Sequence, residues 1–176
     1  MKWDAKVGQW EAKVLSKAPR EGVCPIPAQL LSTALETDGV SQVEQVVSPS
    51  IAHTLLSHVN ARLAAARKTQ LSVRERLLNN MLCEGNRYDM KLDLADVPVR
   101  DALNAVVAAL GSQFSRLLGP CPELFELGAL VADAGAQQQP VHPDTPWSKA
   151  AMVVTCAIAL QDVTVAMGPT IFLPQT

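Results

Sequence analysis

The sequence has few aromatic residues, no excess of positive charge and no long uncharged apolar run. Aromatic side chains make up 4% of the chain, and the formal net charge is -2. Such a chain lacks the basic surface that attracts nucleic-acid phosphates or anionic lipids, and it offers few rings on which bases stack. No stretch approaches the roughly 18 apolar residues with which a helix crosses a membrane. We therefore expect neither nucleic acid nor membrane as a partner.

Cysteine pairs of the CxxC type are also lacking. The four cysteines are widely spaced, at Cys24, Cys83, Cys121 and Cys156. This scatter favours thiols buried in a reducing compartment over disulfides or a zinc site. The first residues, MKWDAKVGQWEAK, carry charges in place of the apolar core of a secretory signal. We expect a soluble intracellular protein of the cytoplasm.

Apolar residues are plentiful enough for a core and are spaced as in helices over the first two-thirds of the chain. Hydrophobic residues make up 48% of the 176 residues, which suits one globular domain. Ser48 is a favourable N-cap followed by Pro49, and Ser72 with Glu75 forms a capping-box pattern. The predicted helices cover residues 28–39, 49–68, 72–83 and 96–119; the first and last end at glycines.

The other apolar runs are short and lie between turn residues, as strands do. They cover residues 40–47, 87–92, 123–135, 137–142, 151–163 and 170–174. We expect a single domain over residues 1–176, with a mainly helical front at 1–120 and strands at 121–176. This order predicts an α+β protein in which helices pack against an incomplete sheet.

One pair of residues carries the chemistry of a metal site. His142 and Asp144 stand two positions apart at the end of a predicted strand. Side chains two apart on an extended chain point to the same side, so an imidazole and a carboxylate reach one metal together. With a second histidine they form the facial triad of non-haem Fe(II) oxygenases. On the motif alone, a solvated surface turn is the stronger explanation, because HxD occurs by chance in many chains.

The surroundings of this pair resemble the phytanoyl-CoA hydroxylase family of Fe(II)- and 2-oxoglutarate-dependent dioxygenases. The segment QQQPVHPDTPW, residues 137–147, is similar to the first iron-ligand segment of that family. ALQDVTVAMGPTIFLPQT, residues 159–176, is similar to its acidic turn, Gly-Pro pair and following strand. LETDGVSQVEQVVSPSIAHTLLSHV, residues 35–59, is similar to its opening, where a short strand leads into a helix.

The resemblance implies a partial double-stranded β-helix, a cupin-like jelly roll, with N-terminal helices packed on it. It also implies that His142 and Asp144 are two of three Fe(II) ligands and that 2-oxoglutarate is the cosubstrate. The family hydroxylates a small-molecule substrate at an unactivated carbon and converts 2-oxoglutarate to succinate. Tyr88, Lys91 and Trp147 are candidates for the cosubstrate pocket, although a packed strand face and a turn anchored to the core explain them more simply.

The sequence also departs from the family. In the family, the second histidine and the arginine that pairs with 2-oxoglutarate lie downstream of the Gly-Pro strand, and we expect both to be missing from a chain that ends at Thr176. His53 and His58 lie on a predicted helix and are expected to be surface or packing residues. Gln175 stands where a glycine is usual, Pro143 separates the two ligands, and Ala157 falls where the peroxisomal member has a tryptophan. We expect a C-terminally truncated form with little or no dioxygenase activity of its own.

Two other functions remain open. The chain is alternatively a non-catalytic interaction protein that retains half of the β-fold and binds through its helical front. A third possibility is a cupin-like module that binds zinc or manganese and has unrelated chemistry.

Overall fold

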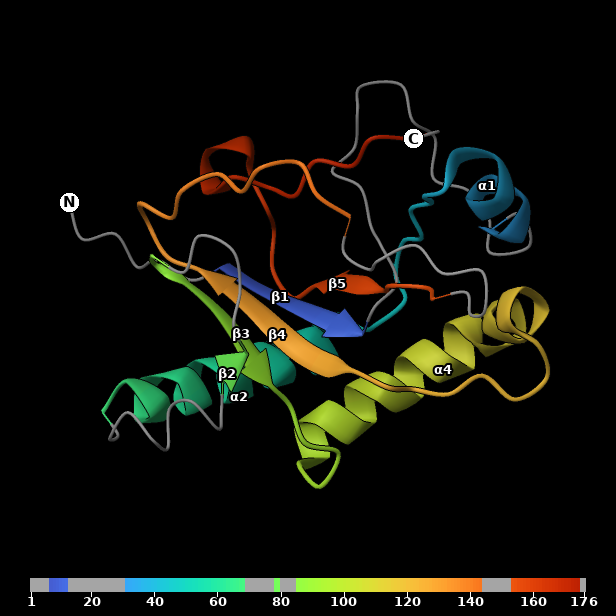
Figure 1. The fold of residues 1–176 in the computed structure, drawn as a ribbon. Coiled ribbons are helices and arrows are strands. Elements are labelled where there is room, and N and C mark those ends of the chain that lie inside the picture. The colour runs from blue at the N-terminus through green and yellow to red at the C-terminus, as the bar shows by residue number, and fades with distance from the viewer. Residues whose placement is uncertain (1–6, 13–30, 69–77, 80–84, 144–152, 175–176) are drawn as a thin grey trace.

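The computed structural model describes residues 7–12, 31–68, 78–79, 85–143 and 153–174. Its elements, in chain order, are β1 (Val7–Ala12), α1 (Leu31–Asp38), α2 (Pro49–Arg67), β2 (Leu78–Asn79), β3 (Arg87–Lys91), α4 (Val97–Leu118), β4 (Leu127–Ala132), β5 (Ala157–Ala159) and the 3-10 helix η2 (Val165–Met167). Helices α2 and α4 lie on one side of the sheet, and the segments that follow β4 and β5 lie on the other (Figure 1).

The long helices begin and end at the residues that the sequence indicated. The hydroxyl of Ser48 accepts a hydrogen bond from the amide of Ile51 at 3.3 Å, so it caps α2 ahead of Pro49. Helix α4 ends at Gly119, whose φ of 94° suits a residue without a Cβ. The predicted helices at 49–68 and 96–119 are confirmed, as is the described part of the one at 28–39.

The five strands form one antiparallel sheet in the order β2-β3-β4-β1-β5. In its register, Arg87 lies opposite Ala132 and Lys91 lies opposite Gly128. A Cβ at Gly128 would lie 2.9 Å from a carboxylate oxygen of Asp89, so any other residue there requires the Asp89 side chain to shift. The predicted strands at 87–92 and within 123–135 are confirmed as β3 and β4, and a short part of 151–163 is confirmed as β5.

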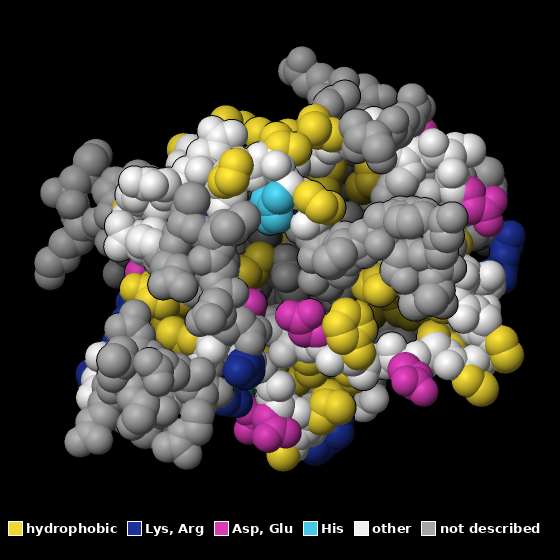
Figure 2. Space-filling model, viewed as in Figure 1, with side chains coloured by type: hydrophobic (Ala, Val, Ile, Leu, Met, Phe, Trp, Pro, Cys, Tyr) yellow, Lys and Arg dark blue, Asp and Glu magenta, His cyan; other side chains and the backbone are white. Residues whose placement is uncertain are grey.

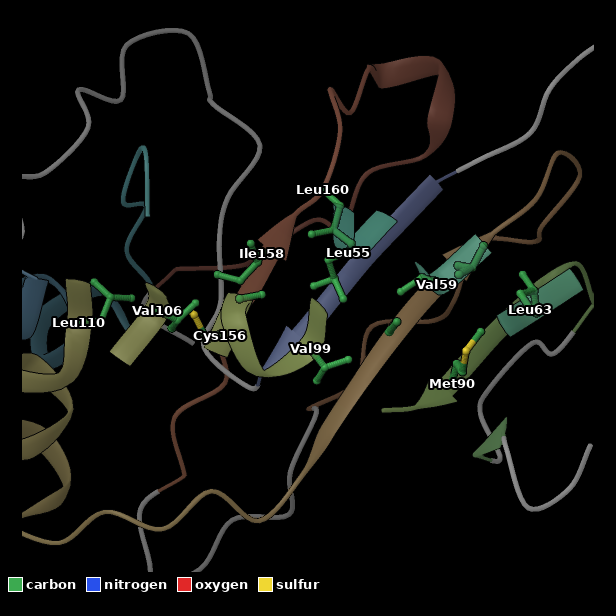
Figure 3. Close-up of a cluster of buried hydrophobic side chains, with 13 residues drawn as sticks. Leu55, Val59, Leu63, Met90, Val99, Val106, Leu110, Cys156, Ile158 and Leu160 are labelled. Carbon is green, nitrogen blue, oxygen red and sulfur yellow. The ribbon is translucent and has the colours of Figure 1, made fainter. Parts of the chain in front are cut away.

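The core lies between the sheet and the two long helices (Figure 3). Buried residues recur every three or four positions on each helix and at alternate positions on the strands. They therefore share one face of each element, and these faces pack together. They are Leu55, Val59 and Leu63 of α2, Val99, Ala102, Val106 and Leu110 of α4, Met90, Ala129, Val131 and Ile158 of the strands, and Cys156 and Leu160 beside β5. Each large side chain buried here contributes roughly 1.5–3 kcal/mol.

Besides the strand predicted at 137–142, which is described with His142 below, three predicted elements are wrong. Residues 40–47 form no strand; Val40 is buried and Val46 half-buried against the core from an irregular path, with Gln45 in the left-handed region. Leu78–Asn79 is a strand paired with β3, not part of a helix, and the rest of 72–83 lies outside the described residues. Residues 170–174 form no strand.

The sheet also draws on the front of the chain. Strands β1, β2 and β3 all precede residue 120, and β1, to which the sequence analysis assigned no element, lies between β4 and β5. The described residues form one sheet, whereas a jelly roll needs two, so the jelly roll stays a prediction. No described helix is long and apolar enough to span a membrane.

Candidate functional site

His142 lies in the irregular segment that follows β4, and its side chain is exposed. Its ring Nδ1 lies 2.7 Å from the backbone carbonyl oxygen of Pro140. A carbonyl oxygen only accepts hydrogen bonds, so Nδ1 must donate, and the lone pair of the neutral ring falls on Nε2. Metal-binding histidines are usually held in this way, with one ring nitrogen donating to a carbonyl and the other facing the metal.

The backbone around His142 is not the strand that the sequence predicted. Residues 136–143 contain no strand, and the chain turns at Asp133–Ala136 as it leaves β4. Pro140 and Pro143 have no N–H to donate to a neighbouring strand, which explains why the run does not join the sheet. The sequence analysis placed His142 and Asp144 on one side because it assumed a strand. The backbone at His142 is not a strand, so that argument loses its support.

Of the other candidate residues, the structure describes only Tyr88 and Lys91. Asp144 and Trp147 lie outside the described residues. Tyr88 and Lys91 are both on β3 but point to opposite faces of the sheet, since they are an odd number of residues apart. Tyr88 is half-buried on the helix side and Lys91 is exposed. These two residues cannot line one pocket.

A polar cluster that the sequence analysis missed joins α2 to the start of α4. Arg62 donates a hydrogen bond to Oδ2 of Asp96, and Nε2 of His58 lies 3.2 Å from the same oxygen. All three side chains are partly buried, with 22–32% of their side-chain surface exposed. His58 thus serves as a contact between α2 and the start of α4.

A second cluster anchors the end of α2. Arg67 forms an ion pair with Asp133, and its guanidinium lies over the ring of Tyr88, 4.6 Å from the centroid. Arg67 and Lys68 are exposed, whereas Arg62 is partly buried. The signal available in the sequence was the i, i+4 spacing of His58 and Arg62, which places them side by side on one helix.

Cys156 is buried against the core, and this desolvation raises the pKa of its thiol far above the usual value. It is therefore a neutral packing residue, as expected, whereas Cys121 is exposed.

Among the residues that the structure describes, no three His, Cys, Asp or Glu side chains lie close enough to hold one metal. Any complete three-ligand site would need residues outside that set, such as Asp144. Comparisons with protein-family models, with curated proteins and with solved structures found no match to this chain.

Proposed function

We propose that this chain is part of an Fe(II)- and 2-oxoglutarate-dependent oxygenase, in which His142 and Asp144 bind the metal. The observation that carries the proposal is the hydrogen bond between Nδ1 of His142 and the carbonyl of Pro140. Because the carbonyl oxygen can only accept, this contact favours the tautomer with its lone pair on Nε2, the nitrogen that would bind the metal. The similarity of residues 137–147 to the iron-ligand segment of the phytanoyl-CoA hydroxylase family supports the same role.

The donor set suits iron. An imidazole and a carboxylate are two of the three ligands that leave open positions on Fe(II) for a 2-oxo acid and oxygen. With both bound, the metal would supply the oxidative chemistry that hydroxylates an unactivated carbon. Exposure of His142 on an irregular segment leaves it accessible from solvent, so a metal would not have to enter through the core.

The two ligands alone would hold a metal weakly, because each missing ligand removes both a bond and part of the geometry. His53 is exposed on α2 and His58 pairs with Asp96, so neither completes the site. We therefore expect the 176 residues by themselves to bind a divalent metal without converting 2-oxoglutarate. Succinate production by the purified chain with Fe(II), oxygen and 2-oxoglutarate would show that this expectation is wrong.

Metal binding is tested by titrating the purified chain with Mn(II), a paramagnetic substitute for Fe(II), and measuring free Mn(II) by electron paramagnetic resonance. Loss of a single outer-shell partner weakens metal affinity about 10–100-fold, so His142→Ala and Asp144→Ala should each weaken it at least tenfold. His53→Ala, which removes an exposed histidine from α2, is the matched control and should leave the affinity unchanged. Wild-type affinity in both site variants would refute the proposal.

A second candidate is a non-catalytic interaction protein, which the exposed apolar side chains favour. Val141, Val165 and Ile171 are 84%, 89% and 71% exposed, and hydrophobic side chains gather over the segments that follow β4 and β5 (Figure 2). Apolar groups collected on a surface are typical of a binding face. A stable, monodisperse chain that takes up neither Mn(II) nor Fe(II) would favour this function over the first.

A further inference from the structure

We draw no further inference here: the strongest candidate, the exposed apolar surface over the segments that follow β4 and β5, which includes Val141, Val165 and Ile171, carries none because nothing in the part of the chain that the structure describes shows what covers it.

Discussion

Arg62 of α2 donates a hydrogen bond to the carboxylate of Asp96, the residue directly before α4. Asp96 occupies the N-cap position of α4, yet its carboxylate makes no hydrogen bond to an amide of its own helix. Nε2 of His58 lies 3.2 Å from the same carboxylate oxygen. A residue type that usually caps a helix is used here to join two helices, and this gives α4 its position against α2.

Asp96→Ala should therefore lower the free energy of unfolding by about 1 kcal/mol, because it leaves Arg62 and His58 partly buried without an acceptor. Asp96→Asn retains a good N-cap residue and loses the charge, so it should be almost as destabilised. Asp101→Ala, an exposed position on α4, is the control. Urea unfolding measures the free energy of unfolding of the three variants. Full stability in Asp96→Asn would show that helix capping, not the link to α2, is what Asp96 supplies.

Two adjacent valines of α4 test the assigned core. Val106 is 1% exposed and points into the cluster between helices and sheet, whereas Val107 is 53% exposed. We expect Val106→Ala to lower the free energy of unfolding by roughly 1.5–3 kcal/mol, through lost burial and the cavity that remains. Val107→Ala should change it by less than about 0.5 kcal/mol, since alanine is the better helix former. Equal effects in the two variants would contradict the orientation of α4.

The long helices could be predicted because their signals are local. Apolar spacing, Ser48 with Pro49 and the glycine after α4 each act within a few residues, and together they fixed the ends of both helices. Strand β1 could not be predicted in the same way. Its partners are β4 and β5, more than a hundred residues later, and a run as short as Val7–Ala12 is specified by those partners rather than by its own residues.

The metal site at His142 and Asp144 stays a prediction. His142 has the hydrogen bond of a metal-binding histidine, but the strand expected to carry it is absent from residues 136–143. Pro140 and Pro143 argue against a strand here, because neither has an N–H to donate to a neighbouring strand. The burial of Nη1 of Arg87 on β3 was beyond prediction, because burial depends on segments that cross the sheet from elsewhere in the chain.

The contact between Gly128 and Asp89 makes a further prediction about the sheet. A Cβ at Gly128 would lie 2.9 Å from Oδ1 of Asp89 on the neighbouring strand. Gly128→Ala should therefore lower the free energy of unfolding by about 1 kcal/mol, as the carboxylate is forced aside. In Asp89→Ala that oxygen is gone, so adding Gly128→Ala should have no further destabilising effect. Additive effects of the two substitutions would show that this close contact does not exist in solution.

Cys121 and Cys156 should differ sharply in reactivity. Iodoacetamide reacts with the thiolate, and burial both shields Cys156 and raises the pKa of its thiol. Under native conditions at pH 8, peptide mapping by mass spectrometry should find Cys121 alkylated and Cys156 unmodified until the protein is unfolded in urea. Equal labelling of the two would place Cys156 outside the core.

The raised pKa of Cys156 also predicts how stability depends on pH. In the unfolded chain this thiol ionises near pH 8.5, whereas burial keeps it protonated in the folded protein to higher pH. Above about pH 8.5 the unfolded state therefore binds fewer protons, and stability falls by up to about 1.4 kcal/mol per pH unit on account of this group. Below about pH 8.5 the thiol is protonated in both the folded and the unfolded state, so its burial stabilises the protein fully. Urea unfolding at pH 7.5, 9 and 10 should show a steeper loss in the wild type than in Cys156→Ala. Cys121→Ala should follow the wild type, and an identical pH slope in Cys156→Ala would mean that Cys156 is not the group responsible.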